Sequence, residues 1–373
     1  MKYPIGIQDF EKLRTNGYSY VDKSRIVYKL ATEGEYYFLS RPRRFGKSLF
    51  LSTLEAYFQG KKELFEGLAI YDLETEWKKY PIFHIDLNTA NFREKDSLYM
   101  VLNDYLTTWE SKYGARESEA TFALRFKGVI ARAAEKEGCG VVILIDEYDK
   151  PILQTLRDPE LQAEHRAQLK AFYSVLKTQD RYIKFAFLTG VTKFGKVSVF
   201  SDLNNLTDIS MDHRYISICG MTEKELLRNF KEGIGELASA NEDNETETID
   251  KLRMRYSGYH FEENSEEIYN PFSVLNTLAN SRYDDYWFKA NTHTFLIDIL
   301  KKHDYCITDL NKAQVKANMM NNVDSNPIPV IYQSGYLTIK SYDERFKNYQ
   351  LGIPNKEVEE GILYIFPPPK TDC

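Results

Sequence analysis

Two stretches of the chain carry residues whose types and spacing suit phosphate chemistry. The first is residues 41–48, with the sequence RPRRFGKS, in which a glycine, a lysine and a serine follow one another. A lysine in this position reaches the β- and γ-phosphates of a nucleotide, and the hydroxyl after it binds Mg²⁺. Gly46 lets the backbone approach a phosphate with no Cβ in the way. The stretch therefore predicts a phosphate-binding loop in which Lys47 contacts the phosphates and Ser48 contacts the metal.

The flanking residues support this interpretation, although one position departs from the usual pattern. An apolar run at residues 36–39 precedes the loop and a helix-periodic run at residues 49–58 follows it, so that a helix N-terminus with free N–H groups would face the anion. The usual sequence is G-x-x-x-x-G-K-[ST], but here Arg41 replaces the first glycine and Pro42 follows it. The alternative is a solvated basic loop that begins a helix, because Gly-Lys-Ser alone is common by chance.

The second stretch is an unbroken aliphatic run, residues 141–145, that ends in Asp146 and Glu147. Such a run is typical of a strand buried on both faces of a parallel sheet, and open α/β sheets bind ligands at the carboxyl ends of their strands. Asp146 is placed to hold Mg²⁺ through water, as the Walker B acid does, and Glu147 to orient or deprotonate an attacking water. The alternative, a solvated strand end, does not explain why a core strand stops at two acids downstream of a Gly-Lys-Ser loop.

A third polar position lies near the end of another apolar run, residues 183–190. The hydroxyl of Thr189 is placed to contact a γ-phosphate or the attacking water, which is the role called sensor 1, and Thr192 is the second choice. The alternative is a threonine that caps the strand end. Lys193 and Lys196 lie in the next loop, where either could neutralise transition-state charge or be an ordinary solvated lysine.

A parallel sheet is needed to bring these side chains together, and the apolar patterns supply its elements. Strands are predicted at residues 36–39, 81–88, 141–146 and 183–190, and helices at residues 49–58, 95–113, 117–137 and 159–177. In the chain, the predicted strand at residues 81–88 is an extra strand between the one that precedes the phosphate-binding loop (36–39) and the one that ends in the two acids (141–146). Glu147 follows Asp146 directly. This is the arrangement of the P-loop ATPase branch with an additional strand and a catalytic glutamate. We therefore predict an α/β fold, a P-loop NTPase parallel sheet with helices on both faces. His84, in the second strand, is interpreted as a core histidine rather than a ligand.

The chain divides into four predicted parts. They are an N-terminal arm (1–35), a P-loop ATPase core (36–211), a helical lid (212–292) and a winged-helix-like domain (293–373). In the arm, Ser24 is expected to cap a helix over residues 24–31. The last part is predicted to hold helices at residues 295–302 and 310–319 and then a hairpin of residues 336–340 and 348–353. Helices followed by a hairpin are typical of a winged helix.

The composition limits the class of protein. The 373 residues are 43% hydrophobic and 28% charged, which is ordinary for a globular protein of two or three domains. The 49 basic and 55 acidic residues give a net charge of −6, which argues against a broad nucleic-acid-binding face. The cysteines, Cys139, Cys219, Cys306 and Cys373, have no short spacing, so neither a zinc site nor a disulfide framework is indicated. With no signal segment and no apolar run of bilayer length, we expect a cytoplasmic protein that does not enter a membrane.

With these motifs in view, the sequence resembles the bacterial AAA-ATPase-like family, whose members often carry a PD-(D/E)XK nuclease-like domain after the ATPase. The resemblance runs nearly from end to end. Its stretches are GIQDF (6–10), YVDKS (20–24), RPRRFGKS (41–48), DEYD (146–149), LTGVT (188–192), NPFS (270–273) and IPNKEV (353–358). The arginine-rich loop resembles this family's own form of the P-loop. No PD…(D/E)-x-K constellation is evident, so we do not expect nuclease activity of this chain.

The resemblance also implies the ligands and the residues around them. ATP and Mg²⁺ are the implied ligands, with Asp146 and Glu147 at the metal and the water. The residues implied to surround the nucleotide are Arg43, Arg44, Phe45, Gly46, Lys47, Ser48 and Leu49.

The favoured hypothesis is Mg-dependent ATP binding and hydrolysis by a switch or motor of the AAA/STAND kind. Its catalytic residues are Glu147, Lys47 and Thr189, and its metal-binding residues are Ser48 and Asp146. A phosphotransferase acting on a small acceptor is disfavoured, because the extra-strand arrangement rather than a kinase lid follows the loop.

The alternative is a nucleotide-gated DNA-binding or regulatory module with little or no hydrolysis. It would contact DNA or a protein partner through the C-terminal domain, and the sequence sets no oligomeric state. Lys340, Arg345 and Lys347 would then make the hairpin a DNA contact. Equally, these residues are ordinary surface charges beside Asp343 and Glu344.

Overall fold

The computed structural model describes residues 1–193, 205–290, 296–297, 299–300, 310, 313–320 and 326–365. The chain forms two compact units. The first, called here the sheet unit, consists of Asp22–Ser40 and Lys47–Ser210. The second, called the C-terminal unit, consists of Met1–Val21, Arg41–Gly46 and Met211–Cys373. The four-part division expected from the sequence stays a prediction.

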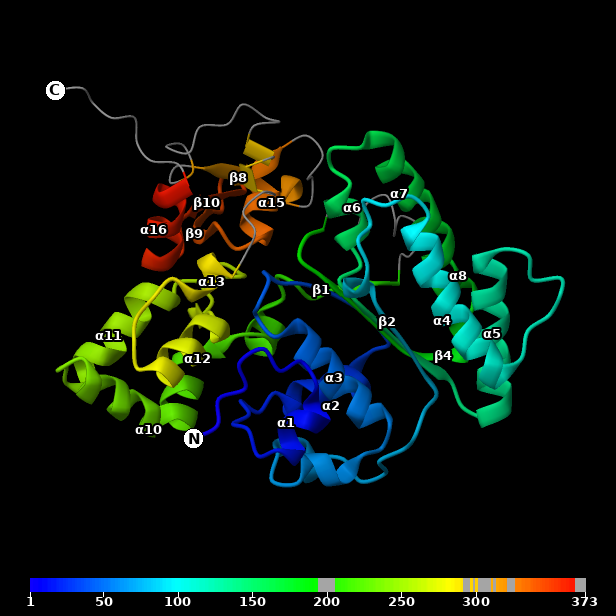
Figure 1. The fold of residues 1–373 in the computed structure, drawn as a ribbon, viewed down its shortest axis with the longest axis horizontal. Coiled ribbons are helices and arrows are strands. Elements are labelled where there is room, and N and C mark those ends of the chain that lie inside the picture. The colour runs from blue at the N-terminus through cyan, green and yellow to red at the C-terminus, as the bar shows by residue number, and fades with distance from the viewer. Residues whose placement is uncertain are drawn as a thin grey trace. The chain divides into compact units, whose positions relative to one another are not determined.

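A five-stranded parallel sheet is the centre of the sheet unit (Figure 1). Its strands are β1 (Tyr36–Ser40), β2 (Ile82–Asp86), β3 (Val141–Asp146), β4 (Ile183–Gly190) and β5 (Thr207–Asp208). Every residue of β1 and β3 is buried, as expected for apolar strands covered on both faces. The sheet and its helices fit the predicted P-loop NTPase-like fold.

The order of strands in the sheet differs from their order in the chain. The sheet order is β2-β3-β4-β1-β5, so β4 lies between the strand before the loop and the strand of the two acids. The stretch expected to be the extra strand forms β2, which lies at the edge of the sheet. The register pairs Leu39 with Thr189 and Asp86 with Asp146. The carboxyl ends of β1, β2, β3 and β4 therefore lie along the same border of the sheet, which is called here its carboxyl edge.

Helices flank this sheet on both sides. They are α2 (Ser24–Glu33), α3 (Lys47–Phe58), α4 (Ser97–Tyr113), α5 (Phe122–Glu137), α6 (Lys150–Gln154), α7 (Pro159–Tyr173) and α8 (Val175–Thr178), with short 3₁₀ turns η1 (Lys62–Phe65), η2 (Ala69–Tyr71), η3 (Leu87–Thr89) and η4 (Asp180–Tyr182). In Figure 1, α2 and α3 lie on one side of the sheet, and α4, α5 and α7 lie on the other. Helix α3 packs against β3 and β4, which places its first residues beside the strand ends.

Ser24 was predicted to cap helix α2, but the structure gives it another role. Ser24 is the first residue of α2 rather than its cap, and its backbone N–H donates to Asp22 Oδ1 at 2.8 Å. The Ser24 hydroxyl instead accepts from the N–H of Ile70 at 3.1 Å. The Asp22 carboxylate also accepts from the N–H of Ala69. Asp22 and Ser24 therefore attach the beginning of α2 to η2.

The C-terminal unit is mostly helical, with two small antiparallel sheets. Its elements are α1 (Phe10–Thr15), η5 (His213–Ile218), β6 (Met221–Thr222), α10 (Glu223–Ala240), α11 (Glu245–Tyr256), β7 (Ile268–Tyr269), α12 (Pro271–Asn280), α13 (Tyr286–Lys289), β8 (Gln314–Lys316), η7 (Ala317–Met319), α15 (Pro327–Gln333), β9 (Thr338–Asp343), β10 (Asn348–Gly352) and α16 (Lys356–Ile365). Capping boxes begin α10, with Thr222 and Glu225, and α11, with Asn244 and Glu247.

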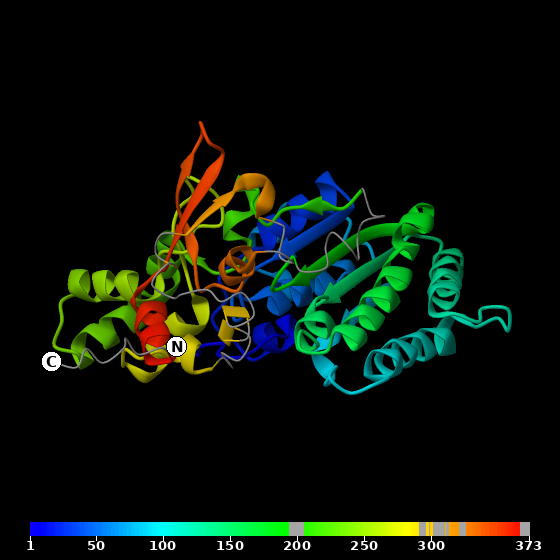
Figure 2. The same ribbon diagram turned by 90° about the horizontal axis from the view of Figure 1, so that it is seen from above.

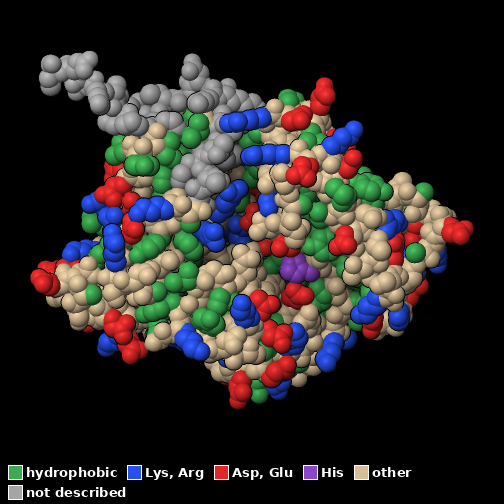
Figure 3. Space-filling view, in the orientation of Figure 1, with side chains coloured by type: hydrophobic (Ala, Val, Ile, Leu, Met, Phe, Trp, Pro, Cys, Tyr) green, Lys and Arg blue, Asp and Glu red, His purple; other side chains and the backbone are tan. Residues whose placement is uncertain are grey.

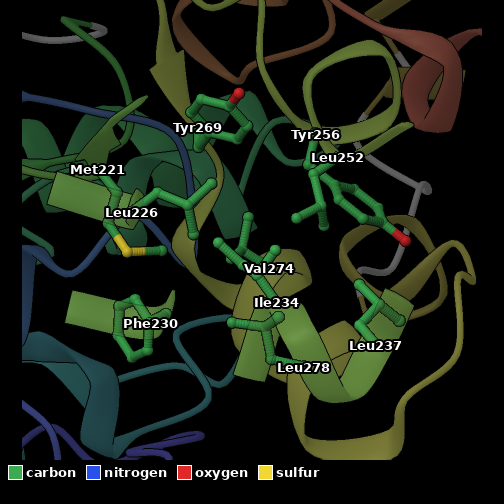
Figure 4. Close-up of a cluster of buried hydrophobic side chains, with 10 residues drawn as sticks. All are labelled: Met221, Leu226, Phe230, Ile234, Leu237, Leu252, Tyr256, Tyr269, Val274 and Leu278. Carbon is green, nitrogen blue, oxygen red and sulfur yellow. The ribbon is translucent and has the colours of Figure 1, made fainter. Parts of the chain in front are cut away.

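A cluster of buried apolar side chains joins α10, α11 and α12 (Figure 4). The cluster consists of Met221, Leu226, Phe230, Ile234, Leu237, Leu252, Tyr256, Tyr269, Val274 and Leu278. The spacing of the α10 members places them on one face of that helix. These helices lie in the region expected to be a helical lid, and the lid itself stays a prediction.

The predicted hairpin is present near the end of the chain. Strands β9 and β10 pair antiparallel, and β8 pairs with the other edge of β10. In Figure 2 the hairpin is seen along its length, with α16 in red at its base. The helix expected over residues 310–319 is wrong, because residues 314–316 form β8. Half of the residues in the helix expected over 295–302 lie outside the described residues, and the winged helix stays a prediction.

Candidate functional site

An ammonium and a carboxylate from distant parts of the chain meet where β1 and β3 end. Lys47 is the first residue of α3, and its Nζ lies 3.2 Å from Glu147 Oε1. The Lys47 side chain is 3% exposed and that of Glu147 is 17% exposed. An ion pair this little exposed is only weakly screened by solvent. The two residues singled out from separate motifs are thus in direct contact within the sheet unit.

Asp146 lies beside this pair at the last position of β3. It is buried, and the hydroxyl of Ser48 is hydrogen-bonded to it. Burial and the neighbouring charge of Glu147 raise the pKa of Asp146 to about 6, against the opposing effects of Ser48 and Lys47. A bound cation would favour the ionised form of this carboxyl. The predicted metal residues, Ser48 and Asp146, are therefore adjacent.

Glu147 itself has a backbone conformation that is rare for a residue with a side chain. Its φ is 52°, and the left-handed region costs about 1–2 kcal/mol for a non-glycine residue. Its N–H donates to Asp146 Oδ1 at 3.0 Å. Residues held in such conformations concentrate at functional sites, and here the turn accompanies the contact of the carboxylate with Lys47.

The two threonines considered for the sensor role are both buried but differ in their contacts. Thr189 lies next to Leu39 of β1, and its hydroxyl has no hydrogen-bond partner among the described residues. The Thr192 hydroxyl donates to Asp149 Oδ2 at 2.7 Å. Because the Thr192 hydroxyl is already engaged, this geometry favours Thr189 as the residue with a hydroxyl left for a ligand.

The residues at this edge fit a magnesium-bound triphosphate. Gly46 has φ of +97°, and apart from its two neighbours in the chain no described atom lies within 4 Å of where its Cβ would be. This leaves open space at the residue where the backbone would approach a phosphate. Ser48 and Asp146 would offer the oxygen ligands that Mg²⁺ and its waters prefer, and the buried Thr189 hydroxyl would be left for a phosphate or a water.

Comparison with known proteins agrees with this geometry. Residues 4–200 match the family described as Predicted AAA-ATPase. The chain belongs to this family. It is also 38% identical over 367 residues to a protein of Azotobacter chroococcum mcd 1 described as an uncharacterized protein in the vnfD 5′ region, covering 97% of this chain and 69% of that one. No solved structure matches the chain significantly.

In this AAA-ATPase-like chain, the predicted loop residues differ in their surroundings. Arg43, Arg44 and Gly46 are exposed, and Leu49 is half-buried. Phe45 is buried, so its backbone, rather than its ring, is the part left to contact a nucleotide. The loop residues up to Gly46 belong to the C-terminal unit.

Two residues of the DEYD motif were given no role from the sequence, yet they organise the strand ends. Asp149 is fully buried and accepts from the N–H groups of Val191 and Thr192, at 3.2 and 2.7 Å, in addition to the Thr192 hydroxyl. The Tyr148 hydroxyl donates to Thr192 O, and the Tyr148 N–H donates to Thr189 O. The end of β3 is therefore fastened to the end of β4. The only sign of this role in the sequence was that a second aspartate, Asp149, follows Asp146 by three residues.

The environment of Asp149 also perturbs its titration. Burial and the charge of Glu147 raise the pKa of Asp149 to about 6, against the hydrogen bonds from Thr192 and Val191. Lys193, in the next position, is buried and pairs with Asp208 at 2.8 Å. The solvated interpretation of Lys193 is therefore wrong, and Lys196 lies outside the described residues.

His84 is half-buried rather than fully inside the core. Its Nδ1 lies 2.8 Å from Glu55 Oε2. Burial alone would lower the pKa of His84, but the contact with Glu55 and the charges of Asp146 and Asp86 outweigh it, so the pKa is raised. Its hydrogen bond is thus satisfied by a neighbouring helix, α3.

The hairpin residues considered for DNA contact lie in a mixed charge environment. Lys340 is exposed on β9, and Asp343 accepts from the N–H groups of Arg345 and Phe346 at the turn. Figure 3 shows basic and acidic side chains interspersed over one face of the molecule, and these hairpin residues are not labelled in it. Both interpretations of the hairpin stay open.

Two general features complete the description. Among the described residues, no helix combines the length and apolar character that crossing a membrane requires. Cys139 and Cys219 form no disulfide among the described residues, and Cys306 and Cys373 lie outside the described residues.

Proposed function

We propose that this chain binds ATP with Mg²⁺ at the edge of the parallel sheet and hydrolyses it, as a switch or motor of the AAA/STAND kind. The observation that carries the proposal is the contact between Lys47 and Glu147, 3.2 Å apart, with Asp146 beside them. An amine for phosphate, a carboxylate for a metal and a carboxylate for water are the parts of a phosphoryl-transfer site. Family membership supports the same proposal.

Each residue has a separate role in the proposed reaction. Lys47 neutralises charge on the β- and γ-phosphates, and Ser48 and Asp146 hold the metal with its water. Bound Mg²⁺ supplies charge neutralisation on the phosphate oxygens. Glu147 orients the attacking water and accepts its proton, and the Thr189 hydroxyl donates to the γ-phosphate or the water.

The contact between Lys47 and Glu147 has a consequence for binding. A triphosphate must compete with the Glu147 carboxylate for the Lys47 amine, so part of the binding free energy is spent in separating the pair. Replacing Glu147 with glutamine weakens that competition. Glu147→Gln should therefore bind ATP at least as tightly as the wild type while it loses hydrolysis, by about 10²-fold or more.

Phosphate release and ATP affinity, measured on the same preparations, test the proposal. Wild type should hydrolyse ATP only with Mg²⁺, Lys47→Ala should lose affinity, and Glu147→Gln should keep affinity but lose turnover. Equal, nonzero turnover in the wild type and both variants would remove the assignment. Tight ATP binding without turnover in the wild type would instead favour the nucleotide-gated regulatory module.

A further inference from the structure

We propose that aromatic residues of the C-terminal unit hold the phosphate-binding loop in its binding conformation, and that Phe261 and Trp287 are positioning residues for ATP. The inference deepens the proposed function and rests on it. Both residues lie outside residues 4–200, the part of the chain that matches the family. All the contacts that carry it lie inside the C-terminal unit, which includes Arg41–Gly46.

The loop needs support from outside because it has few glycines of its own. Arg41 stands where the usual pattern has its first glycine, and Gly46 is the single glycine of residues 41–48. Arg44 nevertheless has φ of 67°, a left-handed conformation. A residue with a side chain keeps such a conformation only where its surroundings impose it. The source of that constraint is therefore to be found among the neighbours of the loop.

Two loop side chains are buried against the same aromatic ring. Arg41 is 1% exposed, and its guanidinium carbon lies 4.0 Å from the centroid of the Phe261 ring. The Phe45 ring lies edge-on to Phe261, at 5.7 Å, and to Tyr259, at 4.9 Å. Cation–π and edge-to-face contacts of this kind are favourable when desolvated. Arg41 is thus turned into the C-terminal unit rather than toward a nucleotide.

Two backbone carbonyls of the loop are held by donors from the same unit. Trp287 Nε1 donates to Arg43 O at 2.9 Å, and the Gly220 N–H donates to Phe45 O at 2.9 Å. Each trans peptide points its C=O and the next N–H in opposite directions, and none of the described peptide bonds is cis. Holding these carbonyls therefore fixes the N–H groups of Arg44 and Gly46, which are donors available to a phosphate.

A close approach of Gly335 to Pro42 adds to the support of the loop. Gly335 has φ of +89°, and a Cβ added there would lie 2.8 Å from Pro42 Cβ and 3.4 Å from Trp287 Cζ2. Only a glycine lets the backbone pass so near to Pro42. The loop backbone is consequently fixed by contacts at Pro42, Arg43 and Phe45.

Thermodynamic linkage makes this support reciprocal. If the contacts favour the loop conformation that binds ATP, then ATP must stabilise the contacts by the same factor. ATP should therefore slow hydrogen exchange in peptides that contain Phe261 and Trp287, although neither residue is proposed to touch the nucleotide.

The test uses the full chain, two loop-contact variants and a matched control. Trp287→Phe removes the N–H donor and keeps an aromatic ring, and Phe261→Leu removes the ring face beneath Arg41. Tyr256→Phe removes a hydroxyl that donates to Asp284 O at 2.9 Å and accepts from the Asp284 N–H at 3.1 Å, in a fully buried residue for which no contact with the loop is described. ATP affinity is measured by calorimetry at a temperature where all the proteins are folded, and hydrogen exchange is followed over residues 41–48.

We expect each loop-contact variant to raise the Kd for ATP by roughly fivefold, because Trp287→Phe loses one hydrogen bond and Phe261→Leu loses a desolvated cation–π contact. Exchange over residues 41–48 should speed up in both, and Tyr256→Phe should change neither quantity. If the wild type binds ATP and both loop-contact variants bind it equally well, the inference is wrong while the proposed function stands. If the wild type binds no ATP and behaves as Lys47→Ala does, the proposed function fails and the inference falls with it.

Discussion

At the scale of single residues, Thr189 and Thr192 are two buried threonines whose hydroxyls differ in their contacts. Both are fully buried. The Thr189 hydroxyl has no partner among the described residues, whereas the Thr192 hydroxyl donates to Asp149. Removing a buried hydroxyl costs stability mainly when its partner is left unsatisfied. The two residues should therefore respond differently to the same substitution.

Thr189→Val should leave the free energy of unfolding nearly unchanged and lower ATP turnover. Thr192→Val should lower the free energy of unfolding by about 1–3 kcal/mol, because the buried carboxylate of Asp149 loses a donor. Denaturant unfolding together with phosphate release measures both effects. Full turnover in Thr189→Val would exclude this hydroxyl from catalysis.

At the scale of elements, close packing holds the end of β3 against β4. A Cβ added at Gly190 would lie 2.5 Å from Asp149 Oδ1 and 2.6 Å from Tyr148 Cδ1. These distances are shorter than any ordinary contact, and the neighbours are buried, so the strand ends must separate to accept a methyl group. Tyr148 and Asp149 directly follow Glu147, so the displacement reaches the proposed catalytic residue.

Gly190→Ala should accordingly lower the free energy of unfolding by about 1–3 kcal/mol and reduce turnover. Gly235→Ala is the matched control, because Gly235 lies in α10 with no described atom within 4 Å of the added Cβ. Alanine there should be neutral or stabilising by up to about 1 kcal/mol. A Gly190→Ala protein as stable and active as the control would contradict the packing argument.

A buried carboxyl connects three helices of the C-terminal unit. Glu357 of α16 accepts from the Ser273 hydroxyl of α12, at 2.8 Å, and from the Trp287 N–H of α13, at 2.8 Å. Burial raises the pKa of Glu357 to about 8, although these hydrogen bonds oppose the shift. Because this pKa is raised on folding, the folded chain binds more protons than the unfolded chain at pH values between about 4.5 and 8. The free energy of unfolding must therefore fall as the pH rises through this window.

Glu357→Gln removes this titration and keeps an amide that can make both hydrogen bonds. Wild type should lose up to about 1.4 kcal/mol of stability per pH unit within the window relative to the variant. Denaturant unfolding at pH 5, 6, 7 and 8 checks the difference. Glu359→Gln, at an exposed position of the same helix, should follow the wild type. Parallel profiles for wild type and Glu357→Gln would refute the raised pKa.

At the scale of the whole molecule, neither unit is a continuous segment. The chain passes from one unit to the other after Val21, Ser40, Gly46 and Ser210. The segment 41–46 belongs to the C-terminal unit, while the residues on both sides of it belong to the sheet unit. Unfolding of the C-terminal unit would therefore release residues 41–46 of the phosphate-binding loop, and unfolding of the sheet unit would release the residues on both sides of them.

We expect a single cooperative thermal transition that Mg-ATP shifts as a whole. At a ligand concentration of about 100 times Kd, the free energy of unfolding should rise by about 2.7 kcal/mol, and Lys47→Ala should abolish the shift. Calorimetry with and without Mg-ATP measures it. Two separate transitions, of which only one moves, would show that the units unfold independently.

Local patterns predicted the main strands of the sheet unit well. The apolar runs before Ser40, Asp146 and Gly190 form β1, β3 and β4 close to the expected bounds, because burial on both faces leaves a strong local signal. The expected helix over 310–319 is wrong because three of its residues pair with β10. A short segment of mixed pattern takes its conformation from its partner strand rather than from its own propensity.

The sequence by itself determined which residues could do phosphate chemistry: Lys47 and Ser48 after a strand, and Asp146 and Glu147 at the end of another. Tertiary structure alone decided that β4 lies between those strands, that Asp149 accepts from the Thr192 hydroxyl while the Thr189 hydroxyl has no hydrogen-bond partner among the described residues, and that the loop is held by residues more than 170 positions away. The physical reason is the range of the interactions. Periodicity and capping act between neighbours in the chain, whereas strand order, buried hydrogen bonds and the contacts of Arg41 depend on which distant side chains folding brings together.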